Sequence, residues 1–176
     1  YLAQACKIRE LWYHGDDAHP MTRQIIKKVL EKGGVVKAVS QLPTSICLGE
    51  VTIQPLHPRP TQTEDLYYSE LNENENSVVL HLNYRGRTAL FTGDVEYTTE
   101  SEWGTHWPKA EILKVPHHGS KTSSSEAFLR TIDPKVGVIS VGERNRFKLP
   151  AAKITRRYYK RGVRIMRTDR DGDIVA

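Results

Sequence analysis

The sequence predicts a layered α/β fold, and three observations support this fold class. First, 176 residues and 20.1 kDa suit one domain, and no linker divides the chain, so we expect residues 1–176 to form a single domain. Second, residues 77–84 alternate in polarity, and after a tight turn at Arg85-Gly86 residues 88–92 return as the second arm of a hairpin. Third, strand-like and helix-like segments alternate from residue 112 onward, which is typical of helices packed on a sheet. These segments are strands at 112–115, 136–141 and 163–166 and helices at 123–131 and 151–160.

The remaining elements follow from local signals. Pro20 suits the first turn of a helix that runs to about Lys32, where Gly33-Gly34 end it. Cys6 and Cys47 are too few for a disulfide-rich scaffold, and we expect them to be buried thiols. We also expect strands at 8–13, 35–39, 51–56 and 173–175 and a long Pro-rich loop at 58–75.

Composition and missing motifs exclude or disfavour several classes of protein. With 38% hydrophobic and 27% charged residues, the chain can form a core and is not intrinsically disordered. No run of 18 uncharged apolar residues is present, so we expect no membrane helix. The chain contains no GxGxxG, P-loop or GxSxG motif, which disfavours dinucleotide enzymes, nucleoside triphosphatases and α/β-hydrolases.

Positive charge is concentrated near the C-terminus. The net charge is +5, and eleven Lys and Arg residues lie between Arg144 and Arg170 against one acidic residue, Asp169. Such a stretch favours a polyanionic partner, although a solvated helix face is the simpler alternative. Four cations at spacing i, i+3, i+4, i+7 would share one helix face and could neutralise phosphates: Lys153, Arg156, Arg157 and Lys160.

Two strand ends carry residues suited to metal chemistry. Thr92-Gly93-Asp94 ends one strand, and Pro116-His117-His118-Gly119 ends the next. Open α/β sheets place their sites at such edges, so we expect Asp94 and the two histidines to lie close together. His is the commonest metal ligand, and a metal there would activate water for hydrolysis. The sequence therefore predicts a metal-assisted hydrolase, with an Asx-turn and a surface loop as the structural alternatives.

Two further segments are candidates for substrate contacts. Asn76 precedes a strand and could bond either substrate or loop backbone. Ser120 and Lys121 begin a donor-rich run, 120–125, that opens a predicted helix. Helix N-termini suit phosphate, and a simple helix cap is the alternative.

Taken together, these segments resemble the metallo-β-lactamase fold, and more narrowly the C-terminal metallo-β-lactamase-like domain of ComEC-type competence proteins, which bring DNA across the bacterial inner membrane. The resemblance runs from about Ile8 to the end of the chain. It rests on residues 74–80, on 90–96 with Thr92-Gly93-Asp94, on 113–124 with His117-His118-Gly119-Ser120, on 138–147 with Asn145-Arg146-Phe147, and on 167–172.

The resemblance implies an αββα sandwich and a divalent metal site for Zn or Mn, with two ions in the complete domain. Asp94 would bridge the metals, and His117 or His118 would supply a ligand. Asn76 falls where many relatives carry another metal-binding His, and Asn145 would contact the substrate. The implied setting is a soluble domain of a bacterial inner-membrane protein. The implied partner is DNA, with hydrolysis of the strand that is not imported.

Two departures from the family pattern matter. The main metal motif, HxHxDH, is absent from this chain, so we expect the fold to lack its N-terminal strands and the chain alone to be inactive. Leu149 stands where relatives often carry His. A non-catalytic DNA-binding or scaffolding domain is therefore an alternative, as is hydrolysis of a choline-phosphate ester on a cell surface.

Overall fold

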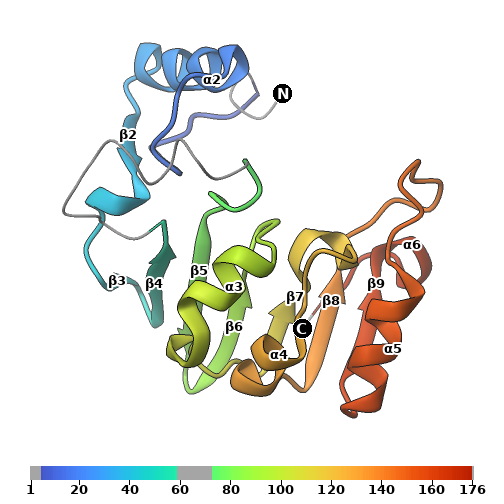
Figure 1. The fold of residues 1–176 in the computed structure, drawn as a ribbon. Helices are drawn as coiled ribbons and strands as arrows, with labels where there is room; N and C mark the ends of the chain where they lie inside the picture. The colour runs from blue at the N-terminus through green and yellow to red at the C-terminus, as the bar shows by residue number, and fades with distance from the viewer. Residues whose placement is uncertain (1–4, 59–72, 176) are drawn as a thin grey trace.

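A seven-stranded sheet dominates the computed structural model, which describes residues 5–58 and 73–175 (Figure 1). The strands follow one another in chain order across this sheet. They are β3 (Ile46–Leu48), β4 (Val51–His57), β5 (Val79–Tyr84), β6 (Arg87–Phe91), β7 (Ile112–Lys114), β8 (Val136–Ile139) and β9 (Arg164–Arg167). Two further strands, β1 (Glu10–Tyr13) and β2 (Val35–Ala38), pair in parallel as a separate small sheet.

The pairing of neighbouring strands changes from antiparallel to parallel at β6. Neighbouring strands from β3 to β6 pair antiparallel, whereas β6, β7, β8 and β9 run parallel. The predicted hairpin is β5–β6, with Tyr84 opposite Arg87. Because parallel strands end at the same edge of a sheet, the segments that follow β6, β7, β8 and β9 gather on one rim.

Three helices cover one face of the sheet (Figure 1). They are α3 (Tyr97–Trp103), α4 (Glu126–Ile132) and α5 (Ala152–Lys160). The core lies between them and the sheet, where Leu90, Leu113, Phe128, Ile154 and Tyr158 are buried. Each such side chain contributes about 1.5–3 kcal/mol by burial. The other helical segments are α2 (Pro20–Glu31), α6 (Thr168–Asp171) and the 3₁₀ turns η1 (Val39–Gln41), η2 (Gly104–His106) and η3 (Pro116–Gly119).

The opposite face of the sheet is also apolar. Leu82, Phe91, Ile112 and Val138 line a cavity of about 390 Å³ there, together with Ile174 from the C-terminal segment. Phe91 is 48% exposed. Both faces of the central strands are therefore hydrophobic, as expected of strands in α/β sheets.

Most predicted elements are confirmed, with bounds that shift by one to three residues. The strand expected at 173–175 is wrong: these residues form no regular element and follow the short helix α6, in which Asp171 accepts the Arg167 N–H at 2.6 Å. The helix expected to begin at residue 123 begins at Glu126. The short strand β3 was not predicted, and Cys6 and Cys47 are free but exposed rather than buried. Most of the predicted loop at 58–75 lies outside the described residues.

None of the helices in the described part of the chain combines the length and hydrophobicity needed to cross a bilayer.

Candidate metal centre

Asp94 sits in a tight turn directly after β6. Gly93 has φ +54°, and a Cβ atom built on it would lie 2.6 Å from the Cβ of Ser77. Only glycine fits such a turn without strain. The Ser77 Oγ accepts the Asp94 N–H at 2.9 Å, and the Asp94 carboxylate stays about one-third exposed. The turn therefore delivers an accessible carboxylate at the rim.

His117 and His118 lie in η3, after β7, in an uncommon backbone conformation. Their φ values are +45° and +53°, in the left-handed region that non-glycine residues rarely adopt. Each such residue costs on the order of 1–3 kcal/mol, and such strain clusters at functional sites. The His117 N–H donates to the Gly93 carbonyl at 3.3 Å, which ties this strained turn to the one that carries Asp94.

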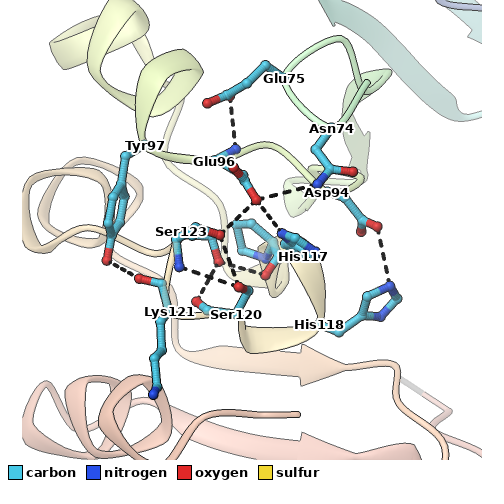
Figure 2. A network of polar contacts seen from close by, with 12 residues as sticks. Asn74, Glu75, Asp94, Glu96, Tyr97, His117, His118, Ser120, Lys121 and Ser123 are labelled. Atoms are coloured by element: carbon cyan, nitrogen blue, oxygen red, sulfur yellow. Dashed lines mark hydrogen bonds and ion pairs between the residues drawn. The ribbon is translucent and has the colours of Figure 1, made fainter. Parts of the chain in front are cut away.

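The His118 ring faces Asp94 (Figure 2). Its Nδ1 lies 2.5 Å from the Ser140 carbonyl oxygen, so Nδ1 carries the proton and donates it. The lone pair of Nε2 is then directed to the other side of the ring, where Nε2 lies 3.4 Å from Asp94 Oδ2. Two electron-pair donors that face each other are stabilised by a shared proton or by a cation between them.

His117 turns to a different partner. Its Nδ1 lies 2.7 Å from Glu96 Oε1 without the alignment of a hydrogen bond, so the contact is an ion-pair contact whenever the ring is protonated. Glu96 Oε1 also accepts from the Thr122 hydroxyl at 2.7 Å and from the Asn74 amide at 3.4 Å (Figure 2). The two adjacent imidazoles thus have separate surroundings, with ring centroids 6.4 Å apart.

Two buried carboxylates that the sequence did not single out support the rim. Glu75 accepts the backbone N–H groups of residues 96, 98 and 99, so it caps α3 from a distant part of the chain. Glu100 accepts the N–H groups of Ser124 and Ser125 at 2.5 and 2.7 Å, and burial raises its pKa to about 7. These long-range contacts leave no local sequence signal, which is why the sequence did not reveal them.

A cation already lies beside Asp94. The Lys114 ammonium is 3.6 Å from Asp94 Oδ1 and donates to the Gly93 carbonyl at 3.0 Å. Burial lowers the pKa of Lys114, and the nearby Asp94 charge opposes that shift. The two carboxylate oxygens therefore differ: Oδ1 faces Lys114 and Oδ2 faces His118.

Of the other residues predicted to contact substrate, some bond to the protein's own backbone and others are exposed. Asn76 is buried, and it directly precedes Ser77 in the sequence. Ser120 donates its N–H to the His117 carbonyl, and Lys121 is exposed while its carbonyl accepts the Tyr97 hydroxyl. Asn145 is engaged with loop backbone through both ends of its amide.

Of the two alternatives for the segment 120–125, the structure matches the helix cap better than an open phosphate-binding N-terminus. The N–H groups of Ser124 and Ser125 are directed at Glu100, and Ser125 Oγ caps α4 by accepting the Phe128 N–H at 3.1 Å. The alternative, a helix cap, matches the structure.

The basic row on α5 is less uniform than its spacing suggests. Arg157 donates to the Ser124 carbonyl and lies 3.2 Å from Glu126, with a side chain only 12% exposed. Lys153, Arg156 and Lys160 are exposed. Three of the four predicted cations therefore face solvent.

Asp94 and His118 offer a divalent metal suitable ligand atoms, but two ligands are fewer than a catalytic site uses. Carboxylate oxygen and imidazole nitrogen are ligands that Zn²⁺ and Mn²⁺ accept. Catalytic zinc sites use three protein ligands. Within residues 5–58 and 73–175, no group of three or more His, Cys, Asp or Glu side chains lies close enough together to hold an ion.

Curated relatives of the chain include bacterial competence proteins. It is 38% identical over 105 residues to "ComE operon protein 3" of Bacillus subtilis, which covers 58% of this chain and 14% of that protein. It is 32% identical over 117 residues to "Competence protein ComA" of Neisseria gonorrhoeae, covering 65% of this chain and 16% of that protein. The matched regions are thus a small part of much longer relatives.

Structural similarity and a family model agree on the fold. A structure from Parabacteroides distasonis, provisionally assigned as a metal-dependent hydrolase, aligns with a TM-score of 0.51 at 16% identity and covers 96% of this chain and 80% of that one. The model of the metallo-beta-lactamase superfamily matches residues 1–143. The fold class and the resemblance drawn from sequence are confirmed, and the chain belongs to the metallo-beta-lactamase superfamily.

Proposed function

We propose that this chain is the metal-dependent hydrolase-like domain of a bacterial DNA-uptake protein, and that the complete protein cleaves phosphodiester bonds in the strand that is not imported. The observation that carries the proposal is the pairing of His118 Nε2 with Asp94 Oδ2 at the carboxyl edge of the parallel strands. The competence-protein relatives favour the DNA-uptake setting, in which the domain is attached to the inner membrane through other parts of the protein.

The residues have distinct roles in this proposal. A divalent metal would be held by Asp94 Oδ2 and His118 Nε2, and when bound it would supply Lewis-acid polarisation of a phosphate oxygen and lower the pKa of water. The Ser140 carbonyl keeps the His118 proton on Nδ1, so Nε2 remains an electron-pair donor. Ser77 fixes the backbone of Asp94, and Glu96 holds His117 at the side of the site.

Substrate would be held by cations outside the metal site. Lys153, Arg156 and Lys160 are exposed on α5, and Arg144, Arg146 and Lys148 are exposed in the loop after β8. Lys and Arg contacts to phosphates give affinity without sequence preference, as degradation of an arbitrary strand requires.

Asp94→Asn in the complete protein tests the proposed activity. We expect cleavage of a fluorescent single-stranded oligonucleotide to require Zn²⁺ or Mn²⁺. We expect the variant to lose at least about 100-fold in rate, because loss of a direct ligand should cost more than the roughly 10–100-fold typical of residues that only orient a ligand. Asp173→Asn, an exposed carboxylate beyond α6, is the matched control and should cut normally. Cleavage by Asp94→Asn at the control rate would contradict the assignment.

A non-catalytic DNA-binding domain is the second candidate, and the small donor set and Leu149 favour it. It predicts that the complete protein binds oligonucleotide in the presence of EDTA and does not cut it with either metal. Metal-dependent cleavage that Asp94→Asn abolishes would contradict this candidate.

A further inference from the structure

A cavity of about 380 Å³ opens directly beside His118, on the side formed by the loop after β8. Its apolar walls come from Val141, Phe147 and Leu149, and its other lining residues are Ser140, Gly142, Asn145, Thr168 and His118 itself. The volume lies in the range of small-molecule sites, which is 300–1,000 Å³.

Several polar groups of this cavity already bond within the protein. Thr168 Oγ1 accepts the Val141 N–H and donates to the Val141 carbonyl, both at 2.8 Å. The Asn145 amide bonds Gly142 and Leu149, and His118 Nδ1 bonds Ser140. What the cavity offers a ligand is therefore mainly apolar contact, which suits a flat ring better than a sugar or a free phosphate.

One aromatic side chain is held at the cavity in an exposed position. Phe147 is 67% exposed. Its loop is fixed by Asn145, which accepts the Leu149 N–H at 2.8 Å, donates to the Gly142 and Leu149 carbonyls, and also accepts the Lys148 N–H through its own carbonyl. An exposed aromatic ring on a fixed loop loses little conformational entropy when it stacks.

Positive charge lies close to the ring and elsewhere in its loop. The Arg146 guanidinium lies 4.6 Å from the centroid of the Phe147 ring, and Arg144 and Lys148 are exposed in the same loop. Cations interleaved with an aromatic side chain are typical of surfaces that bind single-stranded nucleic acid, because phosphates meet the cations while a base stacks on the ring.

We propose that this cavity binds one nucleobase of a single-stranded nucleic acid, stacked on Phe147, next to the phosphate presented to Asp94 and His118. The inference rests on the proposed function and deepens it, because it names the part of the substrate that the loop after β8 recognises. Stacking tolerates every base, so the site would hold a strand in register without selecting a sequence.

Fluorescence of 2-aminopurine in a single-stranded oligonucleotide, recorded in EDTA, tests this directly. We expect quenching on binding to wild-type protein, little quenching with Phe147→Ala, and recovery with Phe147→Trp. We also expect Phe147→Ala to weaken binding about tenfold, the loss of roughly one stacked base. An oligonucleotide with an abasic position should bind wild type about tenfold more weakly and should not distinguish wild type from Phe147→Ala.

Tyr84→Ala is the matched control. Tyr84 is also an exposed ring with an adjacent arginine over it, at 5.3 Å, but it lies at the hairpin turn on the opposite edge of the sheet. It should bind and quench like wild type. Binding of intact and abasic oligonucleotides with equal affinity, or an unchanged Phe147→Ala, would overturn the base site while leaving metal-dependent cleavage intact. Failure of wild type to bind any oligonucleotide would overturn both proposals.

Discussion

Glu75 is a single residue on which the geometry of the rim depends. It is 2% exposed, and its carboxylate accepts N–H groups from residues 96, 98 and 99 at 3.0–3.1 Å. Burial raises its pKa, but the hydrogen bonds lower the pKa by more, so it ends below the ordinary value of 4.5. Since Glu96 contacts His117, the Glu75 carboxylate orders one neighbour of the candidate metal centre.

Glu75→Gln should lower the free energy of unfolding by about 1–3 kcal/mol at pH 7, because an amide NH₂ would face backbone donors. A carboxyl group with a depressed pKa stabilises the fold above its unfolded pKa, and this contribution is lost as pH falls through the folded pKa. Urea unfolding at pH 7 and at about pH 3.5 should therefore show a gap that narrows in acid. Glu143→Gln, an exposed control, should show no gap at either pH. A gap that is equal at both pH values would contradict the assignment.

His117 and His118 show which features of single residues could be predicted from the sequence and which could not. The His-His pair and Asp94 could be predicted as neighbours, because their strands are adjacent and parallel. Which imidazole faces Asp94 could not, because both backbones are left-handed and the ring directions depend on Ser140 and Glu96, which come from separate elements.

At the scale of elements, the turn between β6 and α3 has the tightest steric requirement that we find at the site. Gly93 has a φ of +54°, and a Cβ atom built on it would lie only 2.6 Å from the Cβ of Ser77. The steric requirement at Gly93 and the hydrogen bond from the Asp94 N–H to Ser77 together fix the carboxylate.

Gly93→Ala should destabilise the protein by about 1–3 kcal/mol through overpacking, in addition to the cost of a positive φ. Gly86→Ala separates the two effects, because Gly86 also has a positive φ, +83°, but nothing lies within 4 Å of a built Cβ. Thermal or urea unfolding should give a clearly larger loss for Gly93→Ala. Equal losses would mean that Ser77 yields to the new methyl group and that the turn is not closely packed.

At the scale of the whole molecule, the candidate metal centre and the basic loop after β8 lie on one rim of the sheet. Because β6 to β9 are parallel, Asp94, the histidine pair, the loop after β8 and α6 all follow strands that end together. The strand–helix order of this half could be predicted from sequence, since its hydrophobic periods are clear. The three-residue strand β3 and the helix at 168–171 could not, because such short elements carry too few residues for a period and depend on tertiary contacts.

Arg156 and Arg157 should behave differently although they are adjacent. Arg156→Ala should leave stability unchanged, weaken binding to single-stranded DNA, and reduce the slope of log K against log salt by about 1. Arg157→Ala should lower the free energy of unfolding by about 1–3 kcal/mol, because it leaves the buried Ser124 carbonyl without its donor. Salt titrations of binding and urea unfolding of both variants check this. A lower free energy of unfolding for Arg156→Ala, or an unchanged one for Arg157→Ala, would contradict these separate roles.

The way the loop after β8 is held has an evolutionary consequence. Within the described residues, the Asn145 side chain bonds only to residues of its own loop, at Gly142 and Leu149. Side chains between those two positions can therefore be exchanged with little penalty to the strands. Over time such a loop can change its own sequence while the strands that carry Asp94 and the histidine pair stay unchanged.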